Sequence, residues 1–88
     1  MFTSYQIKQI LVEESARHDH KQSESFLLIL ADAADSFIRA LPQQSASKET
    51  VFDFLIGFID SMKEYESLKS LFDARQVVHK HFGEVVVL

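Results

Sequence analysis

The stretch SKETVFDFLIGFIDSM, residues 47–62, carries the strongest fold signal in this sequence of 88 residues. Ser47 can cap a helix, and Glu49 follows in the first turn, where a negative charge suits the helix dipole. With each residue turned about 100° from the last, the apolar side chains cover an arc of about 200°. The arc is made of Val51, Phe52, Phe54, Leu55, Ile56, Phe58, Ile59 and Met62. We therefore predict a helix over residues 48–62.

The preceding segment, residues 23–41, has an equally wide apolar arc, and Pro42 ends it because residues before proline avoid the helical region. Leu28 lies alone inside its polar stripe. An ordinary surface helix needs an apolar stripe of only about 100°. Two arcs of twice that width exceed what so small a monomer covers, so we predict a homodimer. The alternative is that the helix of residues 48–62 lies centrally, covered on three sides.

Two further helices complete the prediction, over residues 4–17 and 65–82. Thr3 or Ser4 can cap the first, and Gly83 stands where a left-handed C-terminal cap is expected. The sequence has two Gly, one Pro and none of the dipeptides that favour hairpin turns. We therefore predict an all-α fold, a single domain made of a compact bundle of about four helices.

Two details of this bundle stay open in the sequence. The link before residue 65 lacks Gly and Pro, so the chain near Lys63 is expected to bend rather than break. In the tail, residues 83–88, Val85 can pack back on the last helix as the contact that follows a glycine cap. A valine run is also suited to strand pairing with a partner.

The composition of the chain argues against several classes of function. The net charge is −4 and both halves are acidic, so nucleic acid is an unexpected partner because binding it needs a basic surface. The absence of cysteine removes disulfides and thiol chemistry. The longest apolar run, Phe26–Ala31, is too short to span a membrane, and no signal-peptide pattern opens the chain. We expect a cytoplasmic protein that needs no membrane and no cofactor.

The stretch RHDHKQSE, residues 17–24, offers three interpretations. Histidine phosphotransfer domains are helical bundles with a signature close to His-x-x-Lys-Gly-Ser, which His18, Lys21 and Ser23 resemble. Gln22 replaces the glycine that lets a response regulator approach, which weakens this alternative. A metal site is the second interpretation, since His18 and a second histidine two residues later could chelate in an extended segment. A polar link between helices is the third, and the one we favour.

The inner face predicted for the last helix carries Arg75 and His79 in the middle of its apolar arc, which is made of Leu68, Leu71, Phe72, Val78 and Phe82. A buried arginine needs a partner, because an unpaired buried charge is very costly. An ion pair inside the bundle is one interpretation, with the candidate partners Asp32, Asp35, Asp53 and Asp60. An interface anchor is the other, because arginine is enriched at binding hot spots.

Enzyme motifs such as phosphate-binding glycine loops and nucleophile elbows are absent from the sequence, so we predict a protein that is not an enzyme. The predicted function is a small regulator or adaptor that binds protein, as a homodimer and with a further protein partner. The predicted interface comprises Leu28, Ile29, Phe52, Phe54, Ile56, Phe58, Arg75 and His79. Small bacterial regulators, phage inhibitors, secretion chaperones and antitoxins are all small helical proteins of this type. The fold alone therefore does not indicate which of these classes the chain belongs to.

The order of segments between Leu30 and Val78 also resembles one family. An apolar helix, a polar loop before SKETVFDFLIGFID, and a last helix with LFDARQVV follow one another. This pattern is similar to that of the small helical biofilm and acid-stress regulators of enteric bacteria, the YmgB/AriR group. The resemblance implies an all-helical dimer that acts as a stress regulator, with a DNA association as part of that alternative.

Overall fold

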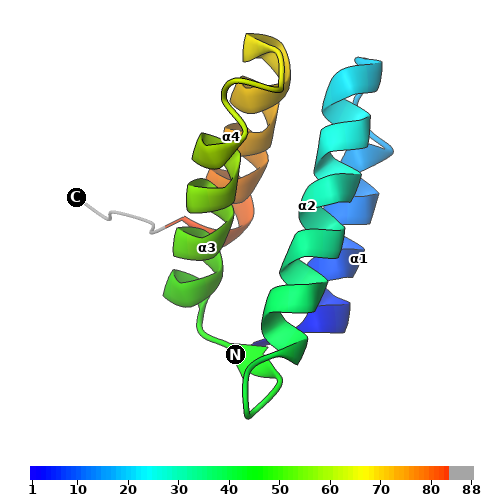
Figure 1. Cartoon of the computed structure of the whole chain (residues 1–88). Helices are drawn as coiled ribbons and strands as arrows, with labels where there is room; N and C mark the ends of the chain where they lie inside the picture. The colour runs from blue at the N-terminus through cyan, green and yellow to red at the C-terminus, as the bar shows by residue number, and fades with distance from the viewer. Residues whose placement is uncertain (84–88) are drawn as a thin grey trace, which may run out of the picture.

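Two helical hairpins build the fold in the computed structural model, which describes residues 1–83 (Figure 1). The first joins α1 (Ser4–Ser15) to α2 (Lys21–Arg39), and the second joins α3 (Lys48–Ser61) to α4 (Leu68–Phe82). α2 contacts all three other helices, most extensively α1. The four helices confirm the predicted all-α bundle.

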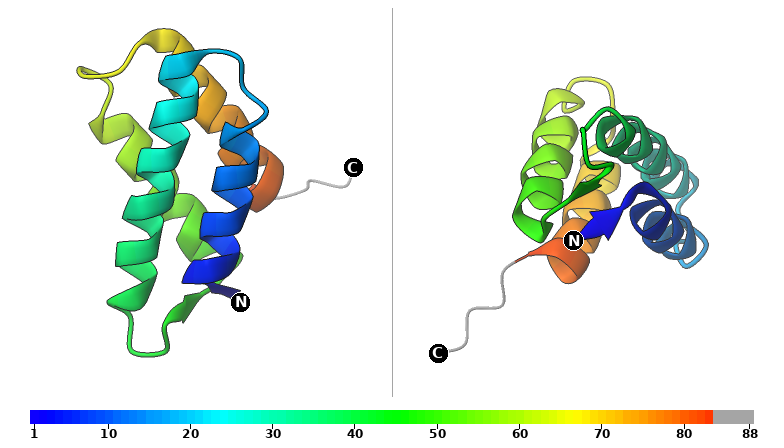
Figure 2. Two further views of the ribbon diagram at one scale, coloured as in Figure 1. Left: turned by 90° about the vertical axis from the view of Figure 1, so that its right-hand side faces the viewer. Right: turned by 90° about the horizontal axis from the view of Figure 1, so that it is seen from below.

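A two-stranded ladder, which the sequence did not reveal, ties the start of the chain to the loop before α3. β1 (Phe2–Thr3) pairs antiparallel with β2 (Ser45–Ala46), and Figure 2 shows the two strands crossing one end of the bundle. The Phe2 ring also meets the edge of the Phe82 ring, with 5.2 Å between ring centroids. The N-terminus is thereby fixed against both the α2–α3 loop and α4.

Three of the four helices start at hydroxyl caps. The Thr3 side chain accepts from the backbone N–H of Gln6, whose own side chain reaches back to Thr3 and completes a capping box. Ser47 caps α3 as predicted. Ser67 caps α4, so this helix starts at Leu68 rather than at residue 65. Each cap satisfies a backbone donor that the helix leaves free.

α2 starts two residues earlier than predicted because a histidine caps it. The Nδ1 atom of His20 accepts from the backbone N–H of Ser23 at 3.2 Å. The helix ends at Arg39, two residues before the predicted end, and Ala40 is its C-cap. Gln44 has a left-handed φ of 52° in the loop that follows.

The structure corrects two predictions about chain breaks. The chain does not bend but breaks between α3 and α4, where residues 62–66 form turns. Gly83 is not left-handed, with φ −72° and ψ 156°. Glycine is instead required there by close approach, since a Cβ atom would lie 2.5 Å from the carbonyl oxygen of His79. The two predictions for Val85 lie outside the described residues.

The core lies where the four helices converge, and α3 explains how a wide apolar arc fits a bundle. Val51, Leu55 and Ile59 are fully buried along the inner line of α3. Its flanking apolar residues are half-buried and pack against the core. α3 therefore rests in the groove between α2 and α4, so much of its arc is covered within one chain. The buried apolar residues of the other elements are Ile7, Leu11, Phe26, Leu27, Leu30, Ala31, Ala34, Ile38, Ala46, Leu71, Ala74, Val77, Val78 and Phe82.

Candidate protein-binding site

α4 is turned differently from the sequence prediction. His79 is exposed and Arg75 only half-buried, so they do not lie on the inner face. Within residues 1–83, Arg75 forms no ion pair, and of its four candidate partners Asp35 pairs with Arg39 at 2.9 Å. The predicted internal ion pair is therefore wrong for the described residues.

The physical reason is that α4 buries polar side chains. Ser70 is fully buried and Asp73 is 8% exposed, whereas the apolar Leu68 and Phe72 are 84% and 56% exposed. Both buried polar groups are satisfied, Ser70 by the hydroxyl of Ser67 at 3.0 Å. A prediction from the hydrophobic pattern places polar residues such as Ser70 and Asp73 on the exposed face of the helix. A polar group that is hydrogen-bonded can nevertheless be buried at little net cost.

An exposed apolar ridge results on the outer edge of α4, formed by Leu68 and Phe72. Tyr65, just before the helix, is 79% exposed as well. At about 100° per residue, Leu68, Phe72, Arg75 and His79 fall within about 60° of one another and form one stripe along the helix. The sequence pattern places Arg75 and His79 in the same apolar arc as Leu68 and Phe72, but it predicts that this arc faces the core.

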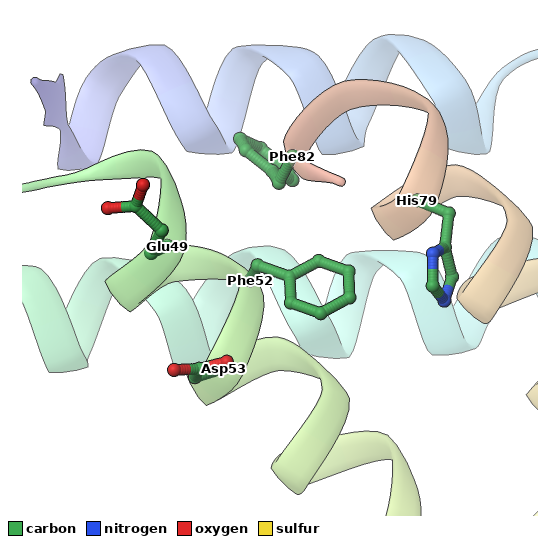
Figure 3. Close-up of a pocket in the computed structure, with 5 residues that line it drawn as sticks. All are labelled: Glu49, Phe52, Asp53, His79 and Phe82. Carbon is green, nitrogen blue, oxygen red and sulfur yellow. The ribbon is translucent and has the colours of Figure 1, made fainter. Parts of the chain in front are cut away.

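A hollow of about 520 Å³ continues this stripe between α4 and α3 (Figure 3). It is lined by Glu49, Phe52 and Asp53 of α3 and by His79 and Phe82 of α4. The Phe52 ring meets the His79 ring edge-on, with 5.0 Å between ring centroids. Two carboxylates thus border a floor of aromatic rings.

The other predicted interface residues separate onto different sides of α3. Phe54 stacks on Phe37 of α2 at 4.2 Å between ring centroids, and Phe58 lies 6.2 Å from Phe54. Ile56 follows Phe52 by one turn and therefore shares its side, toward α4. The structure brings Phe52, Arg75 and His79 to the α3–α4 edge, whereas Phe54 and Phe58 fill the seam with α2.

Leu28 and Ile29 lie on α2 and are 40% and 41% exposed. They belong to a different helix from the residues of the α3–α4 edge. They are scattered surface residues rather than part of one patch with the apolar ridge, and single exposed apolar side chains are normal.

Glu14 is one of two buried carboxylates that hold α4 in place. It accepts hydrogen bonds from Lys80 at 3.0 Å and from Arg17 at 3.3 Å, and its Oε1 lies 3.2 Å from Nε2 of His81. Burial alone would raise the pKa of Glu14, but the hydrogen bonds from His81 and Lys80 outweigh it and lower the pKa below the ordinary 4.5. The ionised carboxylate therefore links α1 to α4.

Asp73 is the second buried carboxylate, and it links α4 to the start of α2. The buried hydroxyl of Ser23 donates to it at 2.6 Å, and Lys69 donates at 3.1 Å. Nδ1 of His18 lies 3.8 Å away. Burial would raise the pKa of Asp73, but the bonds from Ser23 and Lys69 lower it below the ordinary 3.8.

These contacts explain the stretch RHDHKQSE. Residues 16–20 link α1 to α2, as the favoured interpretation has it. His20 caps α2, and His18 faces the carboxylate of Asp73 with its side chain 22% exposed. A phosphate on His18 would bring a second anion toward Asp73, which like-charge repulsion disfavours. The geometry gives both histidines structural roles and does not favour phosphotransfer.

Acid is expected to destabilise the fold through Glu14 and Asp73. Both carboxylates have a folded-state pKa below the unfolded value, so their contribution is complete at neutral pH and is lost as the pH falls through the folded values. We expect the free energy of unfolding to decline as the pH drops below about 4.5, the ordinary pKa of Glu14. Urea titrations from pH 7 to pH 3 test this, and a constant value down to pH 3 would contradict it.

Neither a metal site, nor a membrane-spanning helix, nor a known relative assigns residues 1–83 to a class of protein. Among residues 1–83, no group of three or more His, Cys, Asp or Glu side chains is placed to hold a metal ion. None of the helices in that range is sufficiently long and apolar to cross a bilayer. No family model, curated protein or solved structure matches the chain, so the resemblance to the biofilm and acid-stress regulators stays a prediction.

Proposed function

We propose that this chain is a small, non-enzymatic, cytoplasmic regulator or adaptor that works by binding protein through the α3–α4 edge. The observation that carries the proposal is the apolar ridge of Leu68 and Phe72, 84% and 56% exposed and one turn apart on a well-capped helix. These two side chains are held outward by a helix whose opposite face is fully packed. The ridge is therefore a fixed surface, ready to be covered.

The energetic argument favours a macromolecular partner. Covering a leucine or a phenylalanine completely contributes about 1.5–3 kcal/mol each. Aromatic and arginine side chains are the residues most enriched in binding hot spots, and Phe72 is followed by Arg75 on the same stripe. A shallow apolar ridge beside charged residues is typical of the centre and rim of a protein interface.

The hollow fits this function better than catalysis. Glu49, Asp53 and His79 are exposed, so water reaches all three polar groups of the hollow. Exposed carboxylates on a helix surface are ordinary solvated charges. The half-buried Phe52 ring offers contact area for an inserted side chain, and the two carboxylates can select a partner that carries a positive charge.

A charge on the ridge is expected to abolish binding. Phe72→Glu places a carboxylate at the centre of the proposed contact, while Leu28→Glu places the same charge on an exposed apolar residue of α2. Affinity capture from native lysate, with circular dichroism as a folding control, compares the two variants. We expect a stoichiometric protein partner, the chain itself included, to be lost with Phe72→Glu and retained with Leu28→Glu. Retention by both variants would contradict the proposal.

A further inference from the structure

The α3–α4 edge contains two parts that complement each other. At one end of α4, the apolar ridge of Leu68 and Phe72 projects next to the positive charge of Arg75. Toward the other end, the hollow has an aromatic floor and two carboxylates, Glu49 and Asp53. A projection that is apolar and basic therefore shares one face with a depression that is apolar and acidic.

We infer that the partner on this edge is a second copy of the chain, paired through α4 in antiparallel orientation, so that Phe72 of each ridge enters the hollow of the other copy. This inference rests on the proposed function and names its partner. A two-fold axis makes every contact occur twice, because residue i meets residue j and j meets i. A face that carries both a projection and its matching depression satisfies this condition.

The spacing along α4 agrees with such an axis. With the axis at the level of Val77, Phe72 and Phe82 lie equally far from it, five residues on either side, and Arg75 and His79 lie two residues on either side. At a rise of about 1.5 Å per residue, Phe72 then reaches the level of the partner's hollow. The stripe on α4 is straight enough over this length for both contacts to form together.

Charge sets the orientation. In the antiparallel arrangement Arg75 of each copy lies at the level of the other copy's His79, at the edge of the hollow that Asp53 and Glu49 border on its α3 side (Figure 3). In a parallel arrangement the carboxylates of one copy would face the carboxylates of the other. Like-charge juxtaposition across an interface disfavours the wrong register, so the charges select the antiparallel dimer while the apolar groups supply most of the affinity.

The surface on this side of the bundle is large enough for a dimer interface. A standard interface covers about 800 Å² on each partner. The surface of the chain is 5699 Å², so one side of the four-helix bundle is large enough. α4 also presents this edge along its whole length of 15 residues, from Leu68 to Phe82.

A charge-swap experiment tests the pairing directly. In Arg75→Glu and in Asp53→Arg, each homodimer places like charges at both copies of the contact. Their mixture restores opposite charges at both copies, as does the double variant. Light scattering over a dilution series should give about 20 kDa for the native chain, twice the 10.1 kDa of one copy. Each single variant should raise the dimer dissociation constant at least about tenfold, and the mixture and double variant should recover it.

Controls separate the outcomes. Asp32→Arg makes the same charge change on an exposed residue of α2 and should leave the dimer intact. A dimer that neither single variant weakens, or weakened variants that do not recover on mixing, would overturn the antiparallel pairing. A native chain that is monomeric at every concentration would overturn the second copy as partner. Loss of a different captured protein with Phe72→Glu would then still support the proposed function, whereas its retention would end both.

Discussion

Replacing Leu55 with alanine is expected to lower the free energy of unfolding by about 3–4 kcal/mol. Leu55 is fully buried at the middle of α3, where this helix rests between α2 and α4. The loss combines the transfer of the leucine side chain with the cavity that it leaves. A domain of this size has a total stability of about 4–13 kcal/mol, so the variant is expected to lose a large part of it.

Ile56→Ala, at the next position, is the matched control. Ile56 is half-buried on the α4 side of α3, so its truncation leaves no closed cavity and should cost less than half as much. Chemical denaturation followed by circular dichroism measures both variants under the same conditions. Equal losses at the two positions would show that α3 is rotated from the orientation described.

Replacing Asp73 with alanine is expected to cost about 2 kcal/mol, because the buried hydroxyl of Ser23 loses its acceptor at 2.6 Å. It retains only Nδ1 of His20, 3.0 Å away, which already accepts from the backbone N–H of Ser23. Ser23 is 1% exposed, and its donation to Asp73 at 2.6 Å crosses from α2 to α4. Lys69 and His18 also lose their carboxylate, but both retain access to water.

A double-mutant cycle isolates the link between α2 and α4. Ser23→Ala with Asp73→Ala removes donor and acceptor together, so the double variant should lose less than the sum of the single losses. We expect a coupling of about 1–2 kcal/mol between the two positions. As a comparison, the exposed pair Asp35–Arg39 within α2 should show a coupling of about 0.5 kcal/mol or less. Additive losses at Ser23 and Asp73 would contradict the buried link.

The sequence predicted elements well wherever local chemistry alone decides them. Ser47 caps α3 because a hydroxyl before an apolar helical run satisfies a free backbone donor, and this needs no knowledge of the rest of the chain. The number of helices and the order of the hairpins follow from the same patterns. α2 starts two residues early because His20, a less common cap, begins it, and α4 starts three residues late, after the cap Ser67. α1 ends at Ser15, two residues before the predicted end.

The orientation of α4 could not be predicted, because it depends on partners distant in sequence. Asp73 is satisfied in its buried position by Ser23, 50 residues earlier, which donates to it. Once such polar positions face inward, apolar side chains of the same helix must face outward, and the ridge at Leu68 and Phe72 results. Of the candidate site, the sequence therefore pointed to Phe52, Arg75 and His79, whereas it assigned the ridge of Leu68 and Phe72 to the core.

The ladder of β1 and β2 bears on how long the folded state lasts. Each hairpin joins helices that are neighbours in the chain, so its packing needs only short loops to close, as in fast-folding helical proteins. The pairing of Phe2 with Ala46 and the Glu14–Lys80 contact instead join positions far apart in sequence. Closing such long loops costs more chain entropy, and contacts that are absent from the folding transition state act mainly on the unfolding rate. We expect the β1–β2 pairing and the Glu14–Lys80 contact to be of this kind. Weakening either of them should then raise the unfolding rate more than it lowers the folding rate, and so shorten the lifetime of the folded bundle.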